Sequence, residues 1–518
     1  MSELKRSYDA IIIGTGPGGS SLAYKLTKLG LRILVVERGK QLRPDPNDRS
    51  ASIGRYVYDV AKKDEALSFV GGASKFYGSA LYRLRETDFE AVEHERGASP
   101  AWPITYSEIE PYYLEGETLY RVHGSSVGDP TEPAREQPFP YPPIEHSRLV
   151  RELVDRLARN GTNVSFIPLG LDFRPGGRCV LCSTCDAYYC KLDAKMDAEI
   201  AALRPALATG NVELVTETEC VRVNVDAAGK RVEGVLLRRK GEELTVHSEI
   251  VAVCAGLPHS ALLLWRSRTD AHPSGLGNAG GALGRYLGGH SVGMIFPFVG
   301  WKPVPAVYTK TFAINQFYNG APDWPYPLGV VQVAGLMPFW ENAPPAIRRL
   351  ARAAGKRFLM TFYMTEALPT RSSGIYFDGD EVVSRTPPIH NLQSFSKLRK
   401  VALGMFRQAG YPALALRRPP YVWHEVGTAR FGLDPSTSVA DPNCQVHGIR
   451  GLYVVDASVL PSAGAVNTGL TIIALALRAG AEIAMGSKVK PGSNLSCAAD
   501  ASPAANCEPT ERKGMSGA

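Results

Sequence analysis

A glycine-rich turn near the N-terminus constrains the fold more than any other feature of the sequence. The segment AIIIGTGPGGSSLAYKLTKLGLRILVVERG predicts an apolar strand over residues 8–13, a turn, a helix, and a second strand over residues 32–36. Gly14, Gly16 and Gly19 have the G-x-G-x-x-G spacing of a dinucleotide-binding unit. Gly14 allows the tight turn, Gly16 leaves room for a pyrophosphate, and Gly19 lets the helix pack closely on the strand.

The same unit predicts the fold class and the kind of cofactor. Glu37 ends the second strand, where its carboxylate is placed to accept hydrogen bonds from ribose hydroxyls. We therefore expect an α/β protein with a Rossmann-type nucleotide-binding domain. The spacing alone does not separate FAD from NAD(P). The early position of the turn, and the long interval before the next nucleotide-type strand, favour FAD. We find no second G-x-G-x-x-G directly after an apolar strand, which a reductase with two dinucleotides would be expected to have.

Composition and charge exclude several classes of protein. The 518 residues are 44% hydrophobic and 21% charged, which is typical of a globular protein. No uninterrupted apolar run approaches the roughly eighteen residues of a membrane span, because Gly, Pro or charged residues break the longest ones. The formal net charge of +7 is spread along the chain without a basic tract, so we expect no nucleic-acid partner. The N-terminal residues lead directly into the first strand without a secretory signal pattern, which predicts a cytoplasmic location.

The pattern along the chain predicts two domains built from discontinuous segments. Short alternating runs over residues 211–253 predict a β-meander, and aromatic residues are frequent from 291 to about 365, where strand-like runs dominate. We expect α+β organisation overall, with a second, sheet-containing domain that binds the substrate. The predicted boundaries are 1–290 and 421–488 for the FAD-binding domain, 291–420 for the substrate-binding domain, and 489–518 for a disordered tail.

The C-terminal block contains a candidate catalytic pair. His424 precedes a turn at residues 426–428 that can fix its imidazole, and a later apolar strand ends at Asp456. A helix is predicted to begin near Thr468, with Asn467 directly before it. The N–H groups and positive dipole of a helix start suit a flavin pyrimidine oxygen, which becomes negative on reduction.

Several further segments carry a family resemblance. They are VGGASKFYGSALYRLR at 70–85, VAVCAGLPHSALLLWRS at 251–267, LGRYLGGH at 283–290, and the C-terminal WHEVGTARFG with GLYVVDASVLPSAGAVNTGLTIIALALRAG. Together with the N-terminal turn they resemble the glucose–methanol–choline oxidoreductases, FAD enzymes that oxidise alcohols and sugars. The first segment is similar to the family's flavin-flanking loop G-G-x-S-x-x-x-G, through Gly71, Gly72, Ser74 and Gly78.

The resemblance implies roles for individual residues. His424 matches the histidine that faces the flavin, and Asn467 occupies the position of the second His or Asn. The resemblance also implies that Gly72, Ser74, Asp456 and Thr468 lie at the cofactor. Some relatives attach FAD through a histidine near the flavin loop. The histidine nearest to this loop is His94, so we expect non-covalent FAD.

Four cysteines form a separate motif. Cys179, Cys182, Cys185 and Cys190 have the spacing C-x2-C-x2-C-x4-C within residues 176–199, which could surround zinc or an iron–sulfur cluster. Some members of the family carry a cysteine-rich insertion that holds such a cluster. The run differs from the ferredoxin pattern, which has x3 and a following proline. We favour reduced thiols, a disulfide pair or a remnant motif, so the metal is left unknown.

These observations predict an FAD-dependent oxidoreductase that converts the CH–OH group of a sugar, glycoside or other alcohol into a carbonyl. His424 would accept the hydroxyl proton while hydride leaves for flavin N5, and Asn467 would orient the oxygen. Asn315, Gln316 and Gln332 stand among the aromatics and suit the rim of a sugar ring. The alternatives are a sterol or aliphatic alcohol oxidase, and a catalytically silent flavin-binding electron carrier. The electron acceptor is either oxygen or a redox partner.

Overall fold

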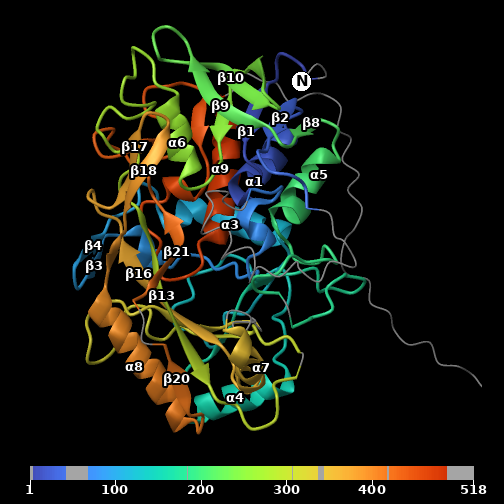
Figure 1. Cartoon of the computed structure of the whole chain (residues 1–518), viewed down its shortest axis with the longest axis vertical. Helices are drawn as coiled ribbons and strands as arrows, with labels where there is room; N and C mark the ends of the chain where they lie inside the picture. The colour runs from blue at the N-terminus through green and yellow to red at the C-terminus, as the bar shows by residue number, and fades with distance from the viewer. Residues whose placement is uncertain are drawn as a thin grey trace, which may run out of the picture.

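The computed structural model describes residues 4–42, 68–183, 185–305, 307–335, 343–416 and 419–486. A parallel sheet lies at one end of the molecule and a larger antiparallel sheet at the other, as Figure 1 shows. The tail predicted over residues 489–518 lies outside the described ranges.

The parallel sheet has the strand order β22-β12-β1-β2-β8. Its strands are short apolar runs such as AIII and ILVV that are buried along their whole length, as expected when helices cover both faces. The predicted succession of strand, glycine turn, helix and strand is present, which confirms the α/β, Rossmann-type fold class. The elements are β1 (Ala10–Ile13), α1 (Pro17–Thr27), β2 (Ile33–Val36), β8 (Val212–Val215), β12 (Val251–Val253) and β22 (Leu452–Val454).

The predicted meander is correct only in its middle part. Strands β9 (Glu219–Val225), β10 (Val232–Arg239) and β11 (Glu242–His247) form an antiparallel three-stranded sheet, but the flanking strands β8 and β12 belong to the parallel sheet. The alternating pattern therefore identified strands without showing which sheet each one joins. Helix α6 (His259–Arg266) packs on β9.

The antiparallel sheet has eight strands and follows the order β20-β13-β16-β15-β14-β6, with β19 beside β16 and β21 beside β13. It draws on segments on both sides of residues 291–420, because β6 and β21 lie outside that range. Its strands are β6 (Ser165–Phe166), β13 (Gly288–Pro297), β14 (Phe312–Ile314), β15 (Val330–Val333), β16 (Thr361–Leu368), β19 (Ile389–His390), β20 (Ala413–Ala415) and β21 (Tyr421–Val426). Helices α4 (Arg148–Arg159), α7 (Pro345–Gly355) and α8 (Leu392–Gln408) surround this end of the molecule.

One helix among the described residues, α9 (Gly469–Gly486), is long and apolar enough to cross a membrane by length and composition. In the fold, 61% of this stretch is buried. The helix packs against α1 and α3 (Tyr106–Leu119) and closes the core of the nucleotide-binding end.

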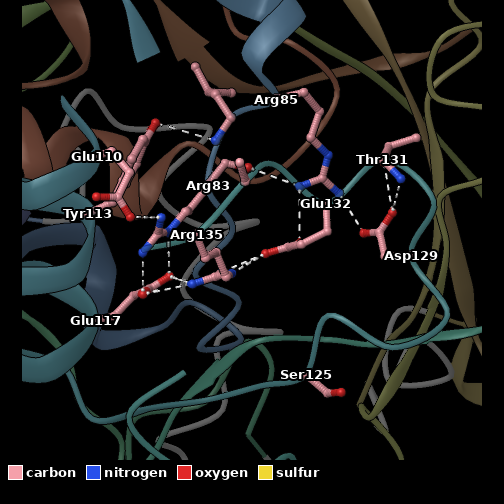
Figure 2. A network of polar contacts seen from close by, with 12 residues as sticks. Arg83, Arg85, Glu110, Tyr113, Glu117, Ser125, Asp129, Thr131, Glu132 and Arg135 are labelled. Carbon is pink, nitrogen blue, oxygen red and sulfur yellow. Dashed lines mark hydrogen bonds and ion pairs between the residues drawn. The ribbon is translucent and has the colours of Figure 1, made fainter. Parts of the chain in front are cut away.

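A network of buried charges joins α3 to the loop that follows β5 (Val122–His123), as Figure 2 shows. The Arg83 guanidinium donates to both carboxylate oxygens of Glu117, at 2.9 and 2.8 Å, and to Glu110 at 2.7 Å. Side chains of the network are at most 8% exposed, and each cation faces at least one carboxylate, which is the condition for burying charge. The other ion pairs join Arg85 to Asp129 and Glu132, and Arg135 to Glu117 and Glu132.

Candidate active site

The glycine turn has the geometry that a dinucleotide requires. A Cβ on Gly14 would lie 2.3 Å from the Cys254 carbonyl oxygen, and one on Gly19 would lie 2.1 Å from the Gly14 carbonyl oxygen, so both positions exclude a side chain. A Cβ on Gly16, which directly precedes α1, would meet no atom within 4 Å. The start of the helix therefore borders open space, which fits a pyrophosphate.

The flavin-flanking loop lies against this turn. A Cβ on Gly72 would be 3.2 Å from the Cα of Gly16, and the Gly71 N–H donates to the Thr15 hydroxyl at 3.0 Å. Ser74 donates to the Gly71 carbonyl at 2.6 Å and accepts from the Ala198 N–H at 3.0 Å. The structure thus brings Gly72 and Gly16 together and uses Ser74 to shape the loop.

Two predicted cofactor residues make contacts within the protein. Glu37 accepts from the Thr15 N–H at 3.2 Å, from the Thr15 hydroxyl at 2.5 Å and from the Gly39 N–H at 2.7 Å. Asp456 accepts from the Gly256 N–H at 2.8 Å. These carboxylates accept hydrogen bonds from backbone N–H groups and so stabilise the backbone around the nucleotide-binding turn. Their contacts to ribose or flavin remain predictions.

Lys75 follows the glycines of the flavin loop. Its side chain is fully buried and forms ion pairs with Asp197, at 3.1 Å, and with Glu199. The lysine therefore ties the loop to the segment that follows the cysteines.

The C-terminal block contacts the nucleotide-binding turn at Gly18, which was not among the predicted site residues. A Cβ on Gly18 would lie 1.9 Å from the Val455 carbonyl oxygen, so only glycine fits there. The adjacent glycines in GTGPGG were the available signal. Thr468 is buried and directly precedes α9, and its carbonyl accepts from the Ile472 N–H.

The backbone places His424 in an unusual conformation. His424 lies within β21 but has φ = +50°, and the pairing of β13 with β21 shifts register between Gly288 and His290. Such a bulge re-aims a side chain, and histidine is among the residues that tolerate this left-handed region. Opposite it, Gly289 has φ = +153°, and a Cβ there would lie 2.8 Å from the Trp423 carbonyl oxygen.

A chain of hydrogen bonds fixes the tautomer of His424. His290 Nε2 faces the carbonyls of Ala463 and Gly464, at 3.3 and 3.0 Å, so it carries a proton. His290 Nδ1 then accepts from His424 Nδ1, which lies 2.9 Å away. His424 Nε2 is left with its lone pair and faces Asn467 Nδ2 at 3.3 Å. Asn467 Oδ1 is buried and has no hydrogen-bond partner within the described structure, which leaves it available to a ligand.

The carbonyls that hold His290 are themselves anchored. Glu366 accepts from the N–H groups of Ala463 and Gly464, at 3.0 and 3.2 Å, and from the Ser99 hydroxyl at 2.7 Å. His290 on β13 is the register partner of Glu366 on β16. These two neighbouring strands therefore both hold the loop at Ala463 and Gly464, His290 through the loop's carbonyls and Glu366 through the loop's N–H groups.

The electrostatics keep this pair of rings neutral. Burial, together with the neighbouring His290 and Lys310, lowers the pKa of His424 to about 3. Burial also lowers the pKa of His290 below its ordinary value. Lys310 donates to Asp186 Oδ1 at 2.6 Å, and both side chains are buried. At neutral pH His424 is therefore an unprotonated base.

Some sequence-based expectations require correction. The turn at residues 426–428 was expected to fix the imidazole of His424, but His290 does so. His290 was given no role by the sequence analysis, although it ends the segment LGRYLGGH that carries the family resemblance. Of the expected sugar-binding amides, Asn315 donates to Asp129 and Ser165, and Gln316 accepts from the Asn163 N–H. Asn315 Oδ1 and Gln332 Nε2 are buried without a partner in the described structure, so their contact with a sugar stays a prediction.

Comparison with known proteins identifies the class and then the family. A model for an NAD(P)-binding Rossmann-like domain matches residues 12–60. Two models described as GMC oxidoreductase match residues 65–292 and 413–476. The chain belongs to the GMC oxidoreductase family, which confirms the resemblance, and it is an FAD-dependent oxidoreductase that acts on CH–OH donors.

Relatives span almost the whole chain. It is 29% identical to a 6'''-hydroxyparomomycin C oxidase from Streptomyces lividus and to a paromamine 6'-oxidase from Streptomyces fradiae, covering 92% of both chains in each case. It is 26% identical to a 2-methyl-1,2-propanediol dehydrogenase from Mycolicibacterium austroafricanum, covering 91% of this chain and 94% of the relative. The solved structure of pyridoxine 4-oxidase from Mesorbium loti has the same fold, with a TM-score of 0.62 and 19% identity over 92% of this chain and 99% of the other.

Proposed function

We propose that the protein oxidises the CH–OH group of a sugar, glycoside or related alcohol to a carbonyl, with His424 as the base. The observation that carries this proposal is the hydrogen-bond chain from Gly464 through His290 to His424, which leaves His424 Nε2 unprotonated beside Asn467. A neutral imidazole held in one tautomer is suited to accept a proton from an alcohol.

The protein residues manage the proton and the position of the oxygen. When the O–H proton passes to His424 Nε2, the C–H bond gives up hydride and the C–O bond becomes a carbonyl. FAD, when bound, supplies the hydride acceptor at N5. Asn467 Nδ2 points at the same nitrogen and holds the substrate oxygen in line with it. Gly14, Gly16, Gly19 and Gly72 form the cradle in which the dinucleotide would lie.

The relatives guide the choice of substrates. Two are named for the oxidation of amino sugars and one for a diol, so the substrate panel includes paromamine, 2-methyl-1,2-propanediol and simple hexoses. The alternatives, a sterol or aliphatic alcohol oxidase and a silent flavin carrier, are tested on the same panel. Bleaching only by sterols or long alcohols favours the first alternative, and bleaching by no alcohol favours the second.

We propose that FAD is held without a covalent bond, because the loop from Gly71 to Arg85 contains no histidine. Acid precipitation should then leave the yellow flavin in the supernatant. Oxygen or a redox partner would reoxidise the flavin, and we expect a cytoplasmic protein.

The cysteine-rich segment is proposed to act without metal. Across the described ranges no group of three or more His, Cys, Asp or Glu residues is arranged to hold a metal ion. Burial raises the pKa of Cys179 to about 11, so this thiol is protonated at neutral pH. Stoichiometric iron or zinc after anaerobic purification would instead establish a cluster or zinc site.

Anaerobic mixing of the purified protein with the panel, followed by flavin absorbance, tests the proposed activity. We expect bleaching by at least one sugar or related alcohol. His290→Phe should bind FAD and remain folded, but it should reduce flavin more slowly because the tautomer of His424 is no longer fixed. Unchanged reduction in this variant would contradict the role given to the hydrogen-bond chain.

A further inference from the structure

Helix α7 is unusual because none of its eleven residues is buried. The helix has the sequence PAIRRLARAAG, and its positions separate by chemistry. Ala346, Ile347, Leu350 and Ala354 fall on one side of a helix with 3.6 residues per turn, and Arg348, Arg349 and Arg352 fall on the other. Ile347 is 52% exposed and Leu350 is 72% exposed, so the apolar side faces outward and does not pack on the fold.

A neighbouring loop adds a tryptophan to this surface. Trp301 is 82% exposed. Its carbonyl accepts from Arg357 Nε at 2.9 Å, and the Val304 N–H donates to the Lys356 carbonyl at 2.6 Å, so the loop is fastened to the end of α7. We call the surface formed by Trp301, Ile347 and Leu350, with the exposed Lys302, Arg349 and Lys356, the α7 patch.

The α7 patch has charge of one sign. Residues 299–310 and 343–358 contain seven Lys or Arg residues and no Asp or Glu: Lys302, Lys310, Arg348, Arg349, Arg352, Lys356 and Arg357. Of these, Lys310 is buried against Asp186 and does not contribute to the surface. Five of the remaining charges are spaced along residues 348–357 without forming an unbroken basic tract, and the fold adds Lys302 from a segment about 45 residues earlier.

We propose that the α7 patch docks the protein on an anionic lipid bilayer, with the helix lying in the interface and not spanning it. The exposed Leu, Ile and Trp would enter the boundary of the acyl chains, and the flanking Lys and Arg would lie among anionic head groups. A tryptophan at the edge of such a surface is the side chain favoured at this depth. The basic residues on both segments of the α7 patch fit a continuous anionic surface.

The location of the α7 patch is compatible with catalysis on a membrane. Helix α7 lies at the end of the molecule remote from the parallel sheet that forms the nucleotide-binding end (Figure 1). None of the residues of the α7 patch takes part in the hydrogen-bond chain of His424. The proposal is therefore independent of the proposed oxidation chemistry, and variants in the α7 patch should leave flavin reduction by a soluble substrate unchanged.

Vesicle co-sedimentation of the FAD-loaded protein tests the proposal. We expect binding to vesicles of equal parts phosphatidylglycerol and phosphatidylcholine, weaker binding at high salt, and little binding to phosphatidylcholine alone. Leu350→Ser should weaken binding about ten-fold. The double variant Arg349→Gln, Lys356→Gln should weaken it on the order of twenty-fold, since each basic residue near an anionic surface contributes about five-fold.

Matched variants outside the α7 patch serve as controls. Leu433 is 77% exposed in another loop, and Arg238 lies on β10 at the other end of the molecule. Leu433→Ser and Arg238→Gln should bind vesicles like the wild type. Equal loss in these controls, no preference for anionic vesicles, or unchanged binding of Leu350→Ser would overturn the proposal. A wild-type dimer that Leu350→Ser converts to a monomer, measured by light scattering, would show that a second copy covers the α7 patch.

Discussion

The protein has two polar clusters in its interior, and one is made of charged groups while the other is neutral. The network around Arg83 contains full charges of both signs, and each cation contacts one or more carboxylates (Figure 2). In the cluster around His424 the rings are neutral: His290 is fully buried, His424 and Asn467 are partly exposed, and Asn467 Oδ1 has no partner in the described structure. In the first cluster the charged groups pair with one another, whereas in the second a polar atom remains available to a ligand.

This difference predicts that the Arg83 network contributes to stability and the His424 cluster to the reaction. Removing one partner of a compensated buried ion pair leaves an unpaired charge, whereas removing a neutral ring with an open acceptor loses little folding energy. We therefore expect substitutions in the Arg83 network to lower the free energy of unfolding, and substitutions near His424 to slow flavin reduction by the substrate.

The largest expected effect is on the reaction itself. His424→Ala should retain FAD and fold, while flavin reduction by substrate slows roughly 10²- to 10⁴-fold because the general base is lost. His424→Asn, which also tolerates a positive φ, separates loss of the base from backbone strain. Stopped-flow flavin reduction measures the rate. Reduction at the wild-type rate would remove His424 from the mechanism.

The next effect should appear in stability and not in rate. Arg83→Met should lower the free energy of unfolding by about 3–5 kcal/mol, because Glu110 and Glu117 lose their shared cation. The exposed pair of Arg148 with Glu152 provides the control, and Arg148→Met should change stability by less than about 1 kcal/mol. Denaturant unfolding measures both. Similar losses in the two variants would contradict the contrast between the clusters.

A smaller effect is expected at Asn467. Asn467→Ala should cost about 1–2 kcal/mol in transition-state stabilisation, roughly a five- to thirty-fold slower reduction, because one hydrogen bond to His424 is lost while the base remains. Its thermal stability should stay near that of the wild type. A loss as large as that of His424→Ala would show that Asn467 does more than orient.

The smallest effect concerns pH. Because the pKa of His424 is lowered to about 3, wild-type reduction should be level between about pH 8 and pH 5 and should fall only in stronger acid. Lys310→Met removes a nearby positive charge and leaves the Asp186 carboxylate. The pKa of His424 should therefore rise, moving the acid limb to higher pH by on the order of one unit.

The matched variant should act in the opposite direction. Asp186→Asn leaves Lys310 without its counter-charge, so the limb should move to lower pH. The double variant should lie near the wild type. An acid limb of the pH profile that stays in place in both single variants would show that the ion pair of Lys310 and Asp186 has no influence on the pKa of His424.

The same two clusters show how far the sequence could be interpreted. The glycine turn was predictable because its spacing encodes a local backbone shape, and the structure has the predicted strand, turn and helix. His424 and Asn467 were identified as a pair by resemblance, and the structure places them 3.3 Å apart.

Other features depended on long-range register. His290 reaches His424 only through a shifted pairing of β13 and β21, and the sequence carries no record of which strands pair. The Arg83 network likewise joins segments whose charges look like ordinary surface charges in the sequence. Gly18 was missed because its constraint comes from Val455, at the other end of the chain.

The contact of Gly18 with Val455 also has a consequence for synthesis of the protein. The parallel sheet places β1 between β2 and β12, and β22 completes it beyond β12. About 400 residues separate β2 from β22, which a ribosome adds in roughly 20–80 s. During that interval the emerging nucleotide-binding unit has an unpaired strand edge and no backbone against Gly18. FAD should therefore be captured after translation has reached the C-terminal block, and chaperones that shield strand edges should raise the yield of loaded enzyme.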